Sequence, residues 1–153
     1  MKRHGARVAK IALFVSVVGL GACTSTTGLD LINFEETRDY QDMYLRGTIS
    51  WWEASEQFKF VKVDPSTYEL TIELIADGQP YDFKIADADW SPRLSCGFEY
   101  ESQAIDLYEK VELACEDTSQ NVKFVPAETG LFTFIFDISD NSEPELVIKR
   151  AQN

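Results

Sequence analysis

The feature that most constrains the fold is an alternating run near the end of the chain, Leu131-Phe-Thr-Phe-Ile-Phe-Asp137. Side chains along a β-strand point alternately to its two faces, so residues two apart share a face. Phe132, Phe134 and Phe136 therefore lie on one side of an extended segment. Three aromatic rings on one face predict a strand that covers a hydrophobic core.

Similar runs recur along the chain at intervals of roughly eight to twelve residues. Turn residues separate them: Asp64-Pro65-Ser66 follows one run, and Asp77-Gly78 has the composition of a hairpin turn. A helical turn is expected only at 102–107. The pattern predicts an all-β fold, an immunoglobulin-like antiparallel β-sandwich. Its expected strands are 43–49, 57–63, 68–75, 81–85, 94–100, 110–115, 122–125, 131–137 and 145–149.

The first 22 residues have the composition of an export signal. Lys2, Arg3, Arg7 and Lys10 give a basic start, and residues 11–20 form an apolar run. This run is too short for a stable membrane-spanning helix, which needs about 20 apolar residues. The pattern predicts a secretory signal peptide that is cleaved.

Leu20-Gly21-Ala22-Cys23 follows the apolar run and resembles the lipobox of bacterial lipoproteins. The resemblance implies cleavage before Cys23, a diacylglyceryl group on its thiol, and an acyl chain such as palmitate on the new amine. In Gram-negative lipoproteins the absence of Asp after the cysteine implies the outer membrane, and here Thr24 follows. An ordinary secretory signal and an N-terminal membrane anchor are the alternatives.

These signals divide the chain into three parts. We expect the signal peptide at 1–22, a lipidated tether at 23–42, and the β-sandwich at 43–150. The tether includes Thr24-Ser-Thr-Thr-Gly28, which is small and polar, as flexible linkers are.

Composition excludes several classes of function. The only histidine is His4, and 14 basic residues stand against 26 acidic ones. The signal peptide carries four basic and no acidic residues, so its removal changes the formal charge from −12 to −16. A mature chain without imidazole excludes Ser-His-Asp and Cys-His catalysis and histidine-based metal sites. Its acidity argues against nucleic-acid binding and leaves the lipid to hold the protein at an anionic membrane.

With Cys23 lipidated, Cys96 and Cys115 remain for an oxidising compartment. We expect them to form a disulfide, whose loop closure contributes about 3 kcal/mol to stability. Two buried free thiols are the alternative. Two cysteines without histidine partners supply too few ligands for a metal site, and no cofactor is expected.

Two further segments carry a family resemblance, Tyr44-Leu-Arg-Gly-Thr-Ile-Ser-Trp-Trp52 and Tyr81-Asp-Phe-Lys-Ile-Ala-Asp-Ala-Asp-Trp90. They resemble the starch- and glycogen-binding β-sandwich modules found beside pullulanases and α-amylases. The segments 124–137 and 144–148 resemble the end of such modules, so the likeness covers about 43–150. The sequence departs from the pattern at two positions: Ser50 replaces the usual asparagine, and Trp51 is additional.

The resemblance implies a sugar site made of Trp52, Lys84 and Trp90. The apolar face of a glucose ring stacks on an indole, and a lysine donates hydrogen bonds to hydroxyl groups. The alternative is that the tryptophans pack in the core and Lys84 is a solvated strand residue.

The acidic residues give no separate catalytic or metal motif. Carboxylates can bind calcium, but the spacing from Asp137 to Glu143 does not fit a calcium-loop motif, so turn and surface roles are favoured. No catalytic motif is present, and a hydrolase is not expected. The acidic candidates are Asp87, Asp89, Asp137, Asp140 and Asn141.

The sequence therefore predicts an outer-membrane lipoprotein with a non-catalytic α-glucan-binding module. Such a module would hold polysaccharide near a secreted glycosidase. The alternative is a structural or interaction lipoprotein that keeps the sandwich and binds an envelope protein through a strand edge or its acidic face.

Overall fold

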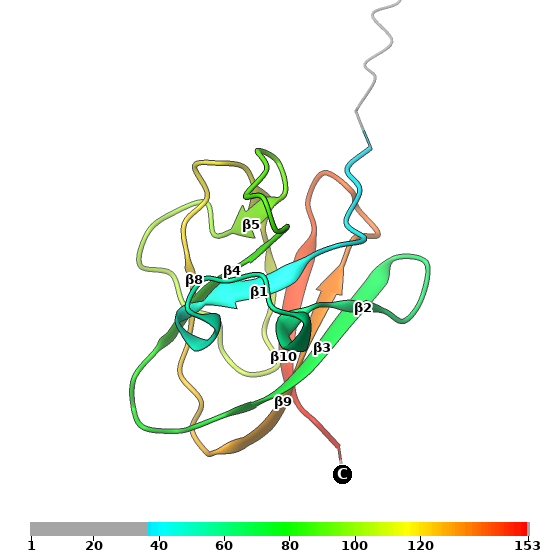
Figure 1. Ribbon diagram of the computed structural model, residues 1–153. Coiled ribbons are helices and arrows are strands. Elements are labelled where there is room, and N and C mark those ends of the chain that lie inside the picture. Colours follow the sequence, from blue (N-terminus) through cyan, green and yellow to red (C-terminus); the bar gives the residue numbers. More distant parts are fainter. Residues whose placement is uncertain (1–36, 153) are drawn as a thin grey trace, which may run out of the picture. The chain divides into compact units, whose positions relative to one another are not determined.

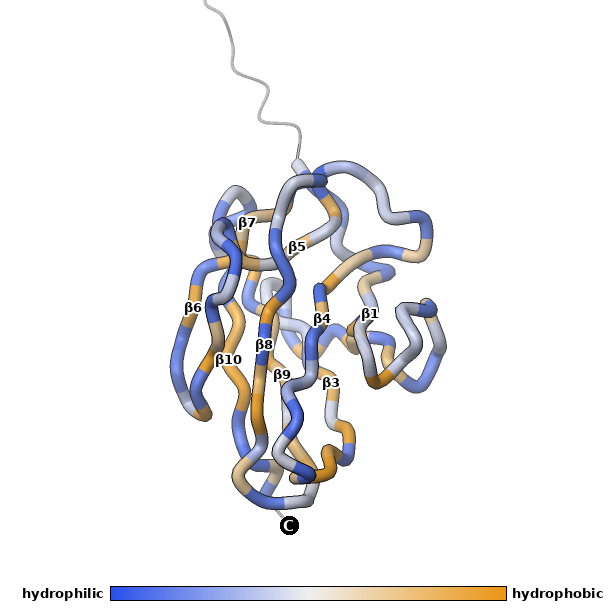
Figure 2. Tube along the Cα trace, turned by 90° about the vertical axis from the view of Figure 1, so that its left-hand side faces the viewer, coloured by the Kyte–Doolittle hydropathy of each residue, from blue (hydrophilic) through white to orange (hydrophobic). Residues whose placement is uncertain are grey.

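The computed structural model describes residues 37–152, which form two antiparallel β-sheets packed face to face (Figure 1, Figure 2). This confirms the predicted all-β sandwich. The signal peptide, Cys23 and the segment 24–28 lie outside the described residues. Within residues 37–152, no helix is long and apolar enough to cross a membrane.

The first sheet has the strand order β1-β4-β5-β7, and β8 also pairs with β4. It consists of β1 (Tyr44–Gly47), β4 (Tyr81–Ala86), β5 (Ser95–Gly97), β7 (Ala114–Cys115) and β8 (Val122–Phe124). The β1–β4 register pairs Leu45 with Ile85 and Arg46 with Lys84. Leu45 and Ile85 are buried between the sheets, so Arg46 and Lys84 lie on the outer face.

The second sheet has the order β2-β3-β9-β10-β6. Its strands are β2 (Val61–Lys62), β3 (Thr67–Leu74), β9 (Gly130–Asp137), β10 (Glu145–Arg150) and β6 (Lys110–Glu112). The long strands alternate buried and more exposed residues, as Figure 2 shows in the alternation of apolar and polar colours along them.

The three phenylalanines of β9 form the centre of the core, as predicted. Phe132, Phe134 and Phe136 are fully buried, and each meets an aromatic ring from outside the second sheet. Phe132 contacts Phe124 of β8, and Phe134 contacts Phe83 of β4, both at 5.5 Å between ring centroids and edge to face. These pairs connect the two sheets, because β8 and β4 belong to the first.

Phe136 contacts Tyr40 at 5.4 Å, again edge to face. Tyr40 is buried, and its hydroxyl donates to the carbonyl oxygen of Asn141 at 3.0 Å. The backbone N–H of Arg38 donates to Asn141 Oδ1 at 3.0 Å. The folded unit thus includes Arg38 and Tyr40, which lie within the predicted tether at 23–42.

The predicted hairpin at Asp77-Gly78 is wrong. The turn is present, with Gly78 at a φ of 82°, but it connects β3 of the second sheet with β4 of the first. β3 pairs instead with β2 and β9. A turn sequence specifies local backbone geometry, whereas the partner of each strand is set by which core face its side chains cover.

Two predicted continuous strands are divided for the same reason. In 57–63, Glu56–Phe58 forms a 3-10 turn (η2), and only Val61–Lys62 is strand, because the chain passes between the sheets here. In 110–115, β6 and β7 belong to different sheets. Leu113 between them is buried, and its N–H donates to the Pro144 carbonyl at 2.7 Å.

Three further boundaries differ. The strand predicted at 43–49 ends at Gly47, where a 3-10 turn (η1, Thr48–Ser50) begins. The strand predicted at 94–100 is only β5, and the helical turn expected at 102–107 is a non-helical loop with turns at its ends.

Cys96 and Cys115 form the predicted disulfide. They are directly paired residues of β5 and β7, and both are buried. The bond joins these short strands, which share only two residue pairs, and so holds the edge strand β7 to β5.

We expect the double variant Cys96→Ala/Cys115→Ala to lose about 3 kcal/mol of unfolding free energy, because the unfolded chain regains the entropy of a 19-residue loop. Denaturant unfolding of the oxidised protein and the variant measures this. Equal unfolding midpoints for the two proteins would contradict a stabilising role for the bond.

Candidate functional site

All three tryptophans of the chain have left-handed backbone conformations, with φ of 53° at Trp51, 64° at Trp52 and 56° at Trp90. A bulky residue in this region costs about 1 kcal/mol or more, so other contacts must stabilise it. Trp51 and Trp52 lie in the turn after β1, and Trp90 lies in the turn after β4. Because β1 and β4 are antiparallel, the two turns leave opposite ends of this strand pair, with Gly47 opposite Phe83 and Ala86 opposite Tyr44.

The first turn is closed around Gly47. The backbone N–H of Gly47 donates to Ser50 Oγ at 2.9 Å, and the N–H of Trp52 donates to the Gly47 carbonyl at 2.9 Å. Ser50, which replaces the asparagine of the resembling modules, is buried and bonds to the backbone. A side chain at position 47 would collide with the backbone of Asp82 and Phe83, so glycine is required there.

The second turn is closed by Asp87. Its carboxylate oxygen Oδ1 accepts the N–H of Ser91 at 2.8 Å, and its own N–H donates to the Leu94 carbonyl at 3.3 Å. This bonding holds the segment that contains Trp90 against the end of β4.

Arg46 joins the two turns. Its Nε and Nη2 donate to the Trp52 carbonyl oxygen at 2.9 and 2.7 Å. Its Nη1 donates to the carbonyl oxygens of Asp87 and Ala88 at 2.8 and 2.9 Å. The guanidinium also lies 3.9 Å from the centroid of the Trp90 ring, a cation–π contact.

Arg46 lies on the outer face of the first sheet and is still only 5% exposed, because the tryptophan turns cover it. Burial lowers the pKa of its guanidinium, while the charges of Glu53, Asp87 and Asp89 raise it. Arginine remains protonated in proteins, so the buried group is a cation that is satisfied by backbone carbonyls.

Trp52 and Trp90 form a pair, here called the tryptophan platform. Their ring centroids are 6.3 Å apart, and their planes are inclined by 37°. Trp90 is 38% exposed and Trp52 is half-buried, so neither belongs to the core between the sheets. The two indoles thus present a bent apolar surface to solvent.

Lys84 lies on β4, opposite Arg46 on β1. It lines a groove of about 500 Å³ together with Trp52, here called the platform groove. Burial lowers the pKa of the Lys84 ammonium, and the charge of Asp117 raises it. The structure therefore brings Lys84 and Trp52 to one groove and Trp52 and Trp90 to one platform.

One wall of the platform groove consists of polar residues that the sequence pattern does not predict to be part of the site. Asp82 and Lys123 form an ion pair across β4 and β8 at 4.0 Å. Period-2 alternation places Asp82 on the face of Lys84, but nothing local indicates that the 119–121 loop approaches it. The remaining lining residues are polar, namely Thr48, Glu101, Ser102, Ser119, Gln120 and Asn121.

The acidic candidates for calcium have turn roles in the structure. Asp137 Oδ1 accepts the N–H of Ser139 at 2.8 Å, and Asp140 Oδ1 accepts the N–H of Ser142 at 2.9 Å. Bonding from the Ser142 hydroxyl lowers the pKa of the Asp140 carboxyl. Asn141 holds Arg38, as described above, and Asp89 is exposed. Over residues 37–152, no three acidic, histidine or cysteine side chains are arranged to hold a metal ion.

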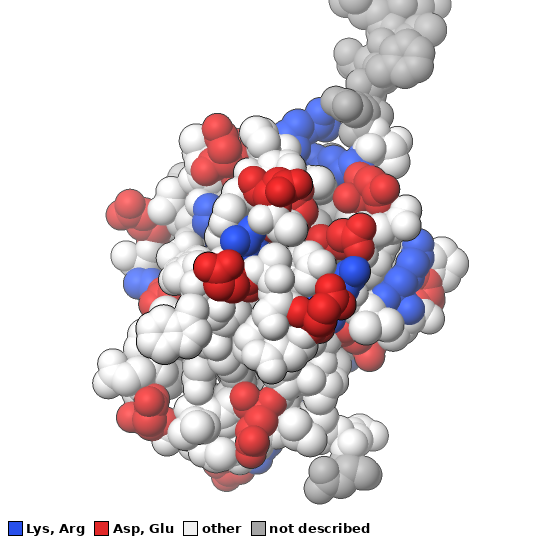
Figure 3. Space-filling view, in the orientation of Figure 1, with Lys and Arg blue, Asp and Glu red and all other residues white. Residues whose placement is uncertain are grey.

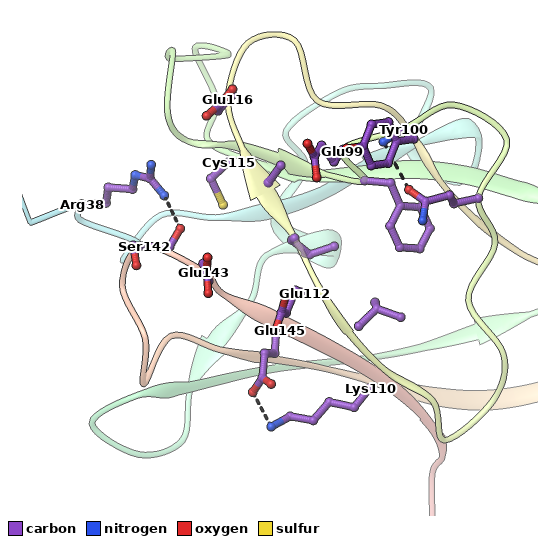
Figure 4. A pocket seen from close by; sticks show the side chains of 15 residues that line it. Arg38, Glu99, Tyr100, Lys110, Glu112, Cys115, Glu116, Ser142, Glu143 and Glu145 are labelled. Atoms are coloured by element: carbon purple, nitrogen blue, oxygen red, sulfur yellow. Dashed lines mark hydrogen bonds and ion pairs between the residues drawn. The ribbon is translucent and has the colours of Figure 1, made fainter.

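A second groove, of about 590 Å³, lies beside the disulfide (Figure 4). Lys110 pairs with Glu145 there, and Arg38 Nη1 donates to the Ser142 carbonyl at 3.1 Å. The other carboxylates that line this groove are solvent-exposed, namely Glu99, Glu112, Glu116 and Glu143. The groove lacks the paired aromatic surface found at Trp52 and Trp90.

We expect Arg46→Ala to lower the unfolding free energy by about 2–4 kcal/mol, because three turn carbonyls lose their donor. Arg46→Lys should recover only part, since an ammonium does not span the same carbonyls. In both variants, the near-UV circular dichroism signal of the tryptophans should be weaker and the denaturant midpoint should be lower than in the wild type. Wild-type spectra and midpoints in both variants would contradict this role.

Comparisons with known proteins agree with the architecture. No protein-family model matches the chain, and no curated protein sequence matches it. The chain is similar to the ligand-induced structure of AmyP-SBD, a starch-binding domain, with a TM-score of 0.53 and 15% identity. The match covers 98% of this chain and 97% of that one. The chain therefore shares the β-sandwich fold of that structure.

Proposed function

We propose that this protein is a non-catalytic α-glucan-binding module, with Trp52, Lys84 and Trp90 as its sugar site. The observation that carries the proposal is the tryptophan platform, two partly exposed indoles 6.3 Å apart on turns that one buried arginine fixes. Rigid aromatic faces beside a few polar groups are the arrangement that binds a sugar ring.

The parts of the site match the chemistry of glucose. The C–H face of a pyranose is apolar and stacks on an indole, and the inclination of 37° between the rings suits a curved chain of such units. Lys84 and the polar wall of the platform groove supply hydrogen-bonding groups for hydroxyls. The starch-binding neighbour supports the same ligand class through its fold.

In this proposal, lipid on Cys23 anchors the mature protein in the outer membrane of a Gram-negative cell. The tether connects Cys23 to the sandwich. The acidity of the protein fits a ligand that carries no charge. Figure 3 shows carboxylates spread over one face of the molecule with basic side chains among them, and the formal charge of the chain is −12, so anionic polymers and lipid headgroups would be repelled.

A protein-binding role is the second candidate, and one observation favours it. Strand β2 is an edge of the second sheet. Val61 in this strand is 64% exposed, and Val63, just after its end, is 53% exposed. An apolar edge strand can pair with a strand of a partner. The exposure of the tryptophan platform favours the sugar-binding function over this one, because a purely structural sandwich needs no rigid pair of surface indoles.

We expect the wild-type protein to be retarded in affinity electrophoresis through amylose or glycogen, and Trp90→Ala, Trp52→Ala and Lys84→Ala to migrate faster than it. Loss of one stacked ring should weaken binding by roughly tenfold. Tyr100→Ala, which removes an exposed aromatic from the groove beside the disulfide, is the matched control. Unretarded wild-type protein, or full retardation of Trp90→Ala, would refute the sugar site.

The lipid anchor has an independent test. Mass spectrometry of the chain purified from its native membrane should show an N-terminus at Cys23 with the added mass of a diacylglyceryl and an acyl group. Cys23→Ser should leave the protein unlipidated. A mature chain that begins at another residue would disprove the anchor without affecting the sugar site.

A further inference from the structure

Trp51 is the tryptophan that the proposed site does not use. It is 84% exposed, more than any other large apolar side chain within residues 37–152. In the described residues its ring makes neither an aromatic pair nor a cation–π contact, whereas Trp52 and Trp90 pair with each other. Its burial by a ligand would remove a large apolar area from water.

The backbone holds Trp51 at the apex of a closed turn. The bonds on either side of it are Trp52 N–H to Gly47 carbonyl at 2.9 Å and Glu53 N–H to Ser50 carbonyl at 3.0 Å. Trp51 has φ 53° and ψ 30°, a left-handed conformation that glycine or asparagine adopts at lower cost. An exposed indole in a strained but anchored position has no stabilising role that the structure shows.

Trp51 is the chain neighbour of Trp52 and therefore lies within one residue of the platform. We infer that Trp51 extends the sugar site, so that the protein binds long α-glucan strands through a stacking surface that short oligosaccharides do not reach. This inference rests on the proposed function. Because the Trp51 ring forms no aromatic pair with Trp52 or Trp90 in the described residues, a ligand that spans only that pair need not reach it.

The test compares a long and a short ligand. The full chain, purified in a detergent without a sugar headgroup, is measured on amylose by affinity electrophoresis and with maltotriose by calorimetry. Trp51→Gly should weaken amylose binding by about three- to tenfold and change maltotriose affinity by less than about twofold. Its thermal midpoint should be equal or higher, because glycine relieves the left-handed strain.

Tyr108→Gly is the matched control, since Tyr108 is also exposed (61%) and left-handed (φ 68°), and it lines neither the platform nor its groove. It should bind both ligands as the wild type does. Trp51→Tyr, which keeps a flat ring, should restore most amylose binding.

The outcomes separate this inference from the proposed function. A wild-type protein that binds neither ligand refutes the function itself. Unchanged amylose binding in Trp51→Gly, an equal loss for both ligands, or the same loss in Tyr108→Gly overturns the inference and leaves the platform intact.

Discussion

The hydrogen bonds of the buried Arg46 guanidinium are the interaction on which the tryptophan platform depends. The guanidinium reaches the carbonyls of both tryptophan turns and lies against the Trp90 ring. A buried cation is costly unless it is fully satisfied, and here backbone carbonyls provide that satisfaction. Either turn alone would leave a left-handed tryptophan with little support. Arg46 thus converts two strained loops into one rigid surface.

The sandwich places this surface by pairing β1 with β4. Gly47 allows the two strands to approach closely at the point where the first turn begins, and Phe83 next to it packs on Phe134 of the opposite sheet. Phe83, together with Leu45 and Ile85 on the same strands, therefore connects the site to the core. The disulfide fastens β7 at the other edge of the same sheet.

Sequence patterns predicted what depends on local periodicity. The three phenylalanines of β9, the strands β3, β4 and β10 and the all-β class followed from spacing and residue type, whereas the disulfide followed from the two cysteines that remain in an exported chain. Predictions that depended on strand partners were wrong, as at Asp77-Gly78 and within 110–115, because pairing is decided by packing between distant segments. The family resemblance indicated Trp52, Lys84 and Trp90, and the structure places Trp52 beside each of the other two. It gave no role to Arg46, which joins a carbonyl six residues away, that of Trp52, to carbonyls 41 and 42 residues away, those of Asp87 and Ala88.

The proposed binding through stacked rings and hydroxyl contacts is compatible with the acidity of this protein, because its negative charge does not repel an uncharged polymer. The three indole N–H groups provide the most direct measurement, since each gives its own signal in a ¹H–¹⁵N spectrum, assigned with single Trp variants. On titration with maltoheptaose, the account predicts that the signals of Trp52 and Trp90 shift together and saturably. Saturable binding that leaves both signals in place, or no change in any signal, would contradict it.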